Sequence, residues 1–232
     1  MSYLESCFLE NIDKSKVKSI FELGSRDLVD ASRLFSYYGC PIYAFECNPD
    51  CLEACKRTYA SFSDRERGHI YLINRAVSLE NGYLTFYAFD LSKYDNMGSS
   101  SLLKIDFTKR DQRDPDYNRP NPQKEVKVQG TRLDTFIEQT GVIPDMVCMD
   151  LQGYELNAIR SMGSYIQRVK YILTECSLRS TYTGGVSFRE LDSYLRSQGF
   201  RYVCSNKFGS SVPDESIQGH CEFDALYVNM SI

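Results

Sequence analysis

The chain has 232 residues, with 27 basic and 31 acidic side chains and a net charge of −4 at neutral pH. This length suffices for one α/β domain with a sizeable core, whereas the slightly acidic balance argues against a general nucleic-acid binder. No apolar run reaches membrane-spanning length, and residues 1–16 are too polar for a signal peptide. Nine cysteines without a C-x-x-C pair favour free thiols in a reducing, cytoplasmic compartment. We expect neither nucleic acid nor a membrane as a partner.

Apolar runs and amphipathic stretches alternate along the first half of the chain. The predicted elements are, in order, a leading helix within 1–16, a strand over 17–22, a helix over 27–38, a strand over 42–46, a helix over 48–59 and a strand over 70–73. Gly39 ends the helix over 27–38, and Pro41 prevents its continuation. Asn48 and Pro49 form a cap and a first turn for the next helix.

The second half of the chain continues the alternation after a stretch of strand signals. The Asn-Gly pair at 81–82 is typical of a hairpin turn. Thr131 with Asp134, and Ser187 with Glu190, have the spacing of capping boxes. The predicted elements are strands over 83–89 and 125–128, a helix to 139, a strand over 146–150, a helix over 154–162, a strand over 169–175, a helix ending at 199, and strands over 200–204 and 223–228. This order predicts one α/β domain over 1–232, with a mainly parallel sheet covered on both faces.

The segment 92–124 breaks this alternation, because it is polar and rich in proline. Two interpretations are open: a solvated loop, or a lid or substrate-binding loop beside the site. The position of the segment supports the second interpretation, since it leaves the sheet near the strand ends, where ligands of α/β proteins bind.

Carboxylates end the first two predicted strands: Glu22 comes just before a turn at Gly24, and Glu46 ends the next strand. Nucleoside cofactors need hydrogen-bond acceptors at such strand ends for their ribose and amino-acid groups. The further glycines of a dinucleotide-binding turn are absent, and no lysine–serine phosphate loop occurs. A cofactor without phosphates fits better. S-adenosyl-L-methionine is the expected one, because its sulfonium, ammonium and ribose diol all attract carboxylates.

Asp150 and Glu175 end two later apolar runs, and consecutive strands commonly lie side by side. The two carboxylates could bind Mg²⁺ or Mn²⁺ and so acidify a substrate hydroxyl, or they could act as general base and substrate anchor. The cation is favoured slightly, because it would relieve their mutual repulsion. An ordinary helix cap is the alternative for Asp150. His220, in a polar loop before the last strand, is either a general base or an exposed loop histidine.

Eight short segments form a further ordered pattern. They are FELG at 21–24, FECNP at 45–49, NRAVS at 74–78, SSSL at 99–102, TRLD at 131–134, MDLQGYE at 149–155, LTE at 173–175 and DALYV at 224–228. Together they resemble the motifs of the FkbM family of S-adenosylmethionine-dependent methyltransferases. The resemblance implies a Rossmann-like class I methyltransferase fold, with a mainly parallel seven-stranded sheet, an antiparallel final strand and helices on both faces. It also implies O-methylation of hydroxyls on sugars or natural products.

The chain departs from the family pattern in two places. Arg26 and Asp27 stand where family members usually have another glycine, and Gln152 stands where many members have glutamate. The first difference affects contacts around the cofactor turn. The second could alter the charge near the reacting centre.

The strand-end carboxylates and the resemblance together give three sets of expected site residues. The cofactor set is Glu22, Gly24, Ser25, Arg26, Asp27, Glu46, Cys47, Asn48, Arg75, Ala76, Val77, Asp150 and Gln152. The catalytic set is Asp150, Glu175 and His220, with Asp150 and Glu175 also the metal ligands, and the substrate set is Ser99, Ser100, Ser101 and Tyr154. Glu46 is expected to accept the ribose hydroxyls, Glu22 to lie near the methionine end, and Ala76 to border the adenine.

The expected activity is that of an S-adenosylmethionine-dependent O-methyltransferase acting on a sugar, glycan or related natural product. The alternative is a non-catalytic nucleoside- or sugar-binding module, since a fold alone does not establish activity. Asp150 and Glu175 discriminate between the two, because a binding module has no need for both carboxylates.

Overall fold

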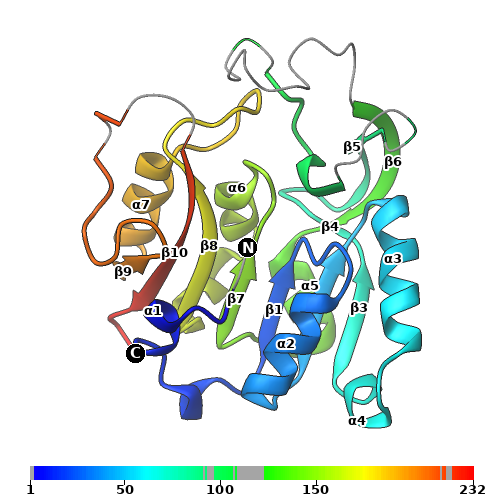
Figure 1. The fold of residues 1–232 in the computed structure, drawn as a ribbon, viewed down its shortest axis with the longest axis horizontal. Helices are drawn as coiled ribbons and strands as arrows, with labels where there is room; N and C mark the ends of the chain where they lie inside the picture. The colour runs from blue at the N-terminus through cyan, green and yellow to red at the C-terminus, as the bar shows by residue number, and fades with distance from the viewer. Residues whose placement is uncertain are drawn as a thin grey trace.

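The computed structural model describes residues 3–90, 92, 97–106, 108, 123–214, 216–217 and 221–232. Within these residues, a seven-stranded sheet crosses the molecule in the order β3-β2-β1-β7-β8-β10-β9 (Figure 1). Its strands are β1 Ile20–Leu23, β2 Ile42–Glu46, β3 Ile70–Asn74, β7 Met146–Met149, β8 Tyr171–Ser177, β9 Phe200–Ser205 and β10 Glu222–Asn229. Strand β10 runs antiparallel to both of its neighbours, and the remaining pairs are parallel. The expected mainly parallel sheet with an antiparallel final strand is confirmed.

Helices cover both faces of this sheet (Figure 1). They are α1 Ser6–Leu9, α2 Val29–Tyr38, α3 Pro49–Ala60, α4 Asp64–Arg67, α5 Leu133–Thr140, α6 Glu155–Arg160 and α7 Phe188–Ser197, with 3₁₀ turns at Lys14–Lys16, Met97–Ser99 and Gly163–Arg168. Helices α1, α2 and α3 bury Phe8, Leu34 and Cys55 on one face. Helices α5 and α6 bury Ile137 and Ile159 on the other face, which α7 also covers. Burial on both faces explains why the strands are continuous apolar runs in the sequence.

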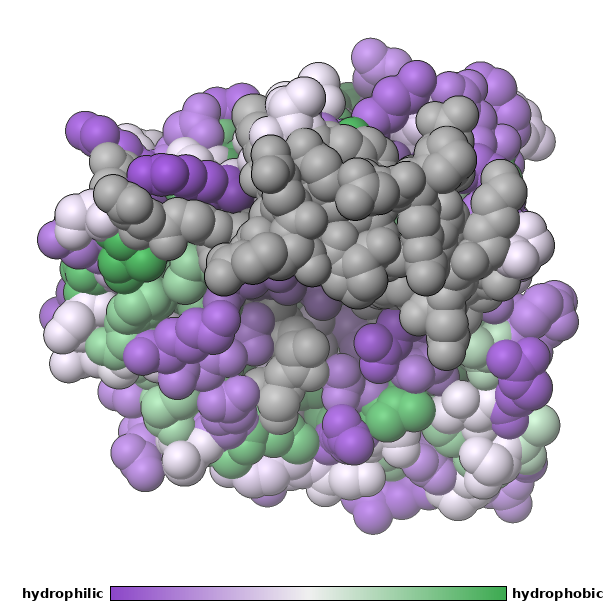
Figure 2. Space-filling model, turned by 45° about the horizontal axis from the view of Figure 1, so that its top comes forward, coloured by the Kyte–Doolittle hydropathy of each residue, from purple (hydrophilic) through white to green (hydrophobic). Residues whose placement is uncertain are grey.

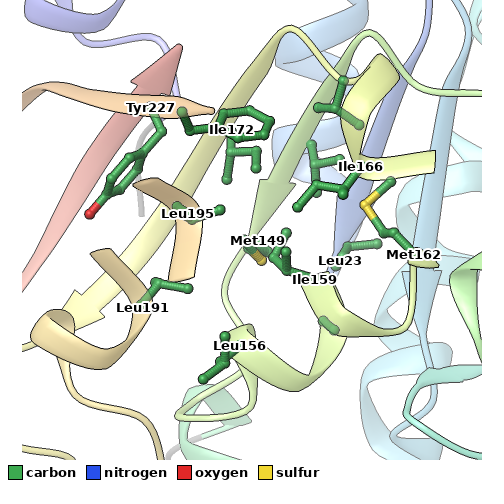
Figure 3. Close-up of a cluster of buried hydrophobic side chains, with 14 of the residues drawn as sticks. Leu23, Met149, Leu156, Ile159, Met162, Ile166, Ile172, Leu191, Leu195 and Tyr227 are labelled. Atoms are coloured by element: carbon green, nitrogen blue, oxygen red, sulfur yellow. The ribbon is translucent and has the colours of Figure 1, made fainter. Parts of the chain in front are cut away.

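Side chains alternate between the two faces along each strand, and this alternation decides where the strand-end acids lie. Leu23 of β1 and Met149 of β7 belong to the apolar cluster beneath α5, α6 and α7 (Figure 3). Ile20 and Cys148, one position out of phase with them, belong to the cluster on the opposite face. Glu22 therefore shares the face covered by α1 and α2.

A second, smaller sheet consists of β4 Ala76–Val77, β5 Gly82–Phe89 and β6 Gln123–Thr131, in the order β4-β6-β5. The Asn-Gly pair at 81–82 connects β4 and β5, but these two strands are not neighbours. Strand β6 lies between them, parallel to β4 and antiparallel to β5. The predicted hairpin turn was therefore wrong, because a strand distant in the sequence takes the place of the expected partner.

The two predicted capping boxes have different outcomes. Ser187 and Glu190 form a complete capping box at the start of α7, as predicted. At α5 the N-cap is Arg132, which makes no side-chain cap. Asp134 pairs with Arg132, so the box predicted for Thr131 and Asp134 was wrong. An adjacent cation competed for the carboxylate, which the spacing of the box does not reveal.

Some element ends also differ from the prediction. The leading helix is a single short turn, α1, and β8 continues past Glu175 to its end at Ser177. Most of the predicted loop over 92–124, namely 93–96, 107 and 109–122, lies outside the described residues, and so does His220. Across the part of the chain that the structure describes, no helix combines the length and the apolarity that crossing a membrane requires.

Candidate active site

A pocket of about 890 Å³, part of it open to solvent, lies at the carboxyl ends of β1, β2 and β7. Glu22, Glu46 and Asp150 line it, and strand alternation brings all three to the face covered by α1 and α2. Figure 2, with the top of Figure 1 turned toward the viewer, shows hydrophilic residues interspersed with hydrophobic ones on this side of the molecule. The pocket combines acidic groups with an apolar wall from the second sheet, which includes Ala76 and Phe86.

Glu22 is the most deeply buried acid of the pocket, with 1% of its surface exposed. The Ser25 hydroxyl donates a hydrogen bond to its Oε2 over 2.6 Å. Burial raises the pKa of Glu22 to about 8, and the charges of Asp30, Asp27 and Glu46 act in the same direction. Glu22 is therefore mostly protonated at neutral pH, and a cation placed beside it would favour its charged form.

Glu46 fixes two loops at the edge of the pocket. Its Oε1 accepts the backbone N–H groups of Cys47 and Asn48, each over 2.7 Å, and its Oε2 accepts that of Arg26 over 2.8 Å. Burial raises the pKa of Glu46, and these three hydrogen bonds oppose the rise. A carboxylate has about four acceptor positions, so about one remains for a ligand.

Gly24 occupies the turn after β1 with a φ of +86°, which favours glycine. A Cβ at this position would collide with the backbone carbonyl oxygen of Asp150. Glycine is thus required by the close approach of two backbone segments. Arg26, where the family pattern has a further glycine, has a left-handed φ of +56°. The chain therefore keeps a glycine-like conformation there with a different residue.

Asp150 and Glu175 are brought together by neighbouring parallel strands, because Met149 pairs with Thr174 in the register of β7 and β8. The side-chain nitrogen of Gln152 lies between their carboxyl groups. It donates to Oδ1 of Asp150 over 2.8 Å and to Oε2 of Glu175 over 2.8 Å. The predicted proximity of the two acids is confirmed, and an amide group that the prediction did not include bridges them.

The Tyr182 hydroxyl donates to Oε1 of the bridging Gln152 over 2.7 Å, which leaves the amide nitrogen facing the acids. Burial, followed by the charge of Asp150, raises the pKa of Glu175 well above its usual value. Glu175 therefore holds a proton more readily than an ordinary glutamate. The arrangement is a carboxylate on the pocket wall with a buried carboxyl group behind it, which is suited to accepting a proton.

Most of the expected site residues line the pocket: Glu22, Gly24, Ser25, Arg26, Glu46, Cys47, Asn48, Arg75, Ala76, Val77, Ser100, Ser101, Asp150, Gln152 and Tyr154. Asp27 and Ser99 are not among the lining residues. The Asp27 carboxylate accepts the backbone N–H of Val29 over 3.1 Å, and the Ser99 carbonyl lies 3.3 Å from the Tyr182 hydroxyl. Glu175 lines a small adjacent cavity on the other side of Gln152.

The pocket residues that were not predicted include Tyr3 and Asp30. Asp30 lies in the first turn of α2, shortly after the turn at Gly24, so its position in the βα unit could have indicated it. Tyr3 is 4% exposed, and its pKa is raised well above its usual value by burial and by Glu22, Cys148 and Asp150. No local sequence pattern indicates that Tyr3 belongs to the pocket, because the tertiary fold brings it there.

The sheet and its helices have the Rossmann-like fold that methyltransferases of known structure also have. Fibrillarin of Aeropyrum pernix, solved with natively bound S-adenosyl-L-methionine, has this fold, with a TM-score of 0.51 and 13% identity over 98% of this chain and 74% of that chain. TrmK of M. capricolum, in complex with S-adenosyl-homocysteine, matches with a TM-score of 0.48 and 9% identity over 92% of this chain. This chain spans 62% of the TrmK chain.

The model of the methyltransferase FkbM domain matches residues 25–202, and the chain belongs to this family. The 2-O-methyltransferase NoeI of Sinorhizobium fredii (strain NBRC 101917 / NGR234) is 25% identical over 184 residues, which cover 77% of this chain and 71% of NoeI. The family expected from the eight motifs is thereby confirmed. Tyr3 and Glu22 precede the matched residues, so the pocket extends beyond the matched part of the domain.

Proposed function

We propose that the protein is an S-adenosyl-L-methionine-dependent O-methyltransferase whose acceptor is a hydroxyl of a sugar, glycan or related natural product. The observation that carries this proposal is Asp150, a carboxylate on the pocket wall with the carboxyl group of Glu175 held directly behind it. Membership of the FkbM family supplies the reaction class. The relative NoeI, a 2-O-methyltransferase, supports oxygen as the accepting atom.

The chemistry of the pocket fits this cofactor. Glu22 and Asp30 supply acidic groups that attract a sulfonium and an ammonium group. Glu46, fixed by three backbone donors, keeps an acceptor position for a ribose hydroxyl. Ala76 and Val77, both buried, offer an apolar border for an adenine ring. The acidic groups, the acceptor and the apolar border together match a positively charged nucleoside without phosphates.

When bound, S-adenosyl-L-methionine supplies a methyl group already activated by sulfonium. In the proposed reaction the acceptor oxygen bonds to the methyl carbon while the carbon–sulfur bond breaks and leaves its electron pair on sulfur, which gives S-adenosyl-homocysteine. Asp150 takes the proton of the acceptor hydroxyl as a general base. Gln152, which also bonds Glu175 behind this base, fixes its orientation. The walls of the pocket align the reactants and exclude water.

The donor set between Asp150 and Glu175 does not fit a divalent cation. Mg²⁺ and Mn²⁺ are bound by oxygen acceptors, whereas the position between these carboxyl groups holds an amide nitrogen that donates to both. No group of three or more His, Cys, Asp or Glu side chains suited to a metal occurs in the described part of the chain. The cation favoured from the sequence is therefore not part of this proposal.

Two measurements test the proposed function. Titration calorimetry with S-adenosyl-L-methionine tests cofactor binding, and incubation with a panel of mono- and oligosaccharides, followed by mass spectrometry, tests methyl transfer. We expect Asp150→Asn to slow transfer by a factor on the order of 10²–10⁴, the usual contribution of a general base. The matched control is Asp192→Asn, which removes a carboxylate on α7, outside the pocket lining.

The outcomes separate the proposal from a binding module. Cofactor binding without transfer to any hydroxyl compound would favour the module. Transfer at the wild-type rate in both Asp150→Asn and Glu175→Gln would remove the general-base role. Failure to bind S-adenosyl-L-methionine at all would reject the proposal.

A further inference from the structure

An amide nitrogen of Gln152 bridges Asp150 and Glu175. In a metal site the space between the two carboxyl groups would have to be open for the cation. The Gln152 amide nitrogen carries two hydrogens, and it lies 2.8 Å from an oxygen of each acid. One N–H group is thus available for each carboxyl group. The partial positive charge of these N–H groups faces both acids, as the full charge of a cation would, but the amide is a fixed part of the chain.

The orientation of this amide is determined by Tyr182. The Tyr182 hydroxyl donates to Oε1 of Gln152 over 2.7 Å, and an inverted amide would lose this hydrogen bond and turn its oxygen toward the oxygens of the two acids. Tyr182 is itself 4% exposed and packs with Phe89 and Ile105. A side chain held in this way does not rotate freely, and it keeps the bridge in one orientation.

The backbone of the bridge is also constrained. Gln152 has a φ of +54°, a left-handed conformation that is unfavourable for a residue with a Cβ. The Glu155 carboxylate holds the turn on both sides, because its Oε1 accepts the N–H groups of Leu151 over 2.9 Å and Gly153 over 3.2 Å. The Ser101 hydroxyl donates to the Gln152 carbonyl over 3.0 Å. Strain that several contacts maintain beside a reactive group points to a function.

We propose that Gln152, oriented by Tyr182, is a positioning residue that takes the place of a divalent cation and holds Asp150 and Glu175 as one metal-free acid–base pair. This inference rests on the proposed methyl transfer and names how its base is held. The amide moderates repulsion between the two acids and points one Asp150 oxygen away from the pocket. The other oxygen is then the one that meets the acceptor hydroxyl.

The decisive experiment is a Mn²⁺ titration of the full chain, followed by electron paramagnetic resonance, which needs neither cofactor nor acceptor. We expect no saturable binding to the wild type. Gln152→Glu replaces the bridging donor with a third carboxylate, so it should bind Mn²⁺ at least roughly tenfold more tightly than the wild type. The matched control is Gln167→Glu, which adds the same charge at an exposed position and should leave binding unchanged.

Two results would overturn the inference. One is saturable Mn²⁺ binding to the wild type that Glu175→Gln abolishes, because a cation would then occupy the pair itself. The other is a folded Gln152→Glu variant that binds no Mn²⁺, because the bridge would then not stand at a cation position. The wild-type titration decides the first case even if the variant does not fold. Methyl transfer is measured separately, so the proposed function can fail or hold independently.

Tyr182→Phe provides a second, kinetic readout. It frees the amide while keeping the ring, so kcat for methyl transfer should fall by roughly tenfold while the affinity for S-adenosyl-L-methionine stays unchanged. The matched control is Tyr202→Phe, which removes a buried hydroxyl that bonds the carbonyls of Gly209 and Ser211 instead. Equal kcat values for Tyr182→Phe and the wild type would contradict the orienting role of Tyr182.

Discussion

The Glu46 carboxylate accepts three backbone hydrogen bonds from two loops and still borders the pocket. We expect Glu46→Ala to weaken binding of S-adenosyl-L-methionine by about 1–3 kcal/mol, the scale of a charge-assisted hydrogen bond plus the loosened loops. Thermal unfolding should also occur at lower temperature, because three N–H groups lose their acceptor. Glu53→Ala, at an exposed position on α3, is the calorimetric control. Equal affinities for Glu46→Ala and the wild type would remove Glu46 from the cofactor site.

Tyr3 brings the beginning of the chain into the pocket. Burial and the neighbouring acids keep its hydroxyl protonated and able to donate, because they raise its pKa well above the usual value. Tyr3→Phe should weaken cofactor binding by about 0.5–1.5 kcal/mol, the net value of one hydrogen bond, and Tyr3→Ala by more, because the wall is lost as well. Tyr59→Ala, on the partly exposed surface of α3, should have no effect. If Tyr3→Ala binds S-adenosyl-L-methionine as tightly as the wild type, Tyr3 only packs in the core and does not contribute to the cofactor site.

At the residue level, the sequence indicated those side chains that follow from strand ends. Glu22, Glu46 and Asp150 each come at or just after the end of an apolar run, and the parallel sheet gathers such positions at one edge. Gln152 was expected to contact the cofactor; it lines the pocket, and its amide also bonds the two acids, which was not predicted. A bridge between side chains depends on rotamers and on Tyr182, thirty positions away, so a local motif cannot reveal it.

The turn that follows β1 is the element on which the pocket depends, because Gly24 approaches the Asp150 carbonyl directly. Gly24→Ala must accept a left-handed conformation and also move β7, so we expect it to lower the free energy of unfolding by clearly more than the roughly 1–2 kcal/mol that the conformation alone costs. Gly39→Ala is a matched control, since Gly39 has a φ of +70° with nothing near its missing Cβ. Urea unfolding compares the two, and equal losses would contradict the close-approach argument.

At the level of elements, predictions from local sequence signals were correct where no other strand or side chain competed for the same partner. The Ser187 capping box formed, and β2 has the predicted bounds of 42–46. The predicted hairpin at 81–82 failed because β6 inserts between β4 and β5, and the box at Thr131 failed because Arg132 pairs with Asp134. Long-range strand pairing and a neighbouring cation are both invisible to the spacing rules that define these motifs.

For the whole molecule, the alternation of strands and helices was sufficient to predict a parallel sheet covered on both faces. The antiparallel final strand came from the family resemblance, since periodicity does not give strand direction. The three-stranded sheet was not foreseen, although two of its strands were predicted. Its strands supply the wall of Ala76, Val77 and Phe86, so the pocket needs both sheets to be complete.

The stability of the whole chain should depend on pH in a direction that the buried acids determine. Burial raises the pKa of Glu22 to about 8 and that of Glu155 to about 7, from 4.5 for an unperturbed glutamate. The folded state then binds more protons than the unfolded state between pH 4.5 and 8. The stabilisation that these two glutamates contribute is therefore fully present below pH 4.5 and is lost as the pH rises through 7 and 8. Each group contributes a slope of at most about 1.4 kcal/mol per pH unit.

We therefore expect the Tm of the ligand-free protein to fall steadily from about pH 5 to about pH 8.5, measured at constant ionic strength. Glu22→Gln should flatten the curve, because its amide stays neutral in the same buried position and still accepts from Ser25. Glu53→Gln, at an exposed site, should leave the slope unchanged. A saturating cationic ligand beside Glu22 should also flatten it, since a nearby positive charge lowers the pKa of the carboxyl group. A Tm that rises over this interval would show that Glu22 is ionised in the folded protein, and the acidic pocket would then be charged before any ligand enters.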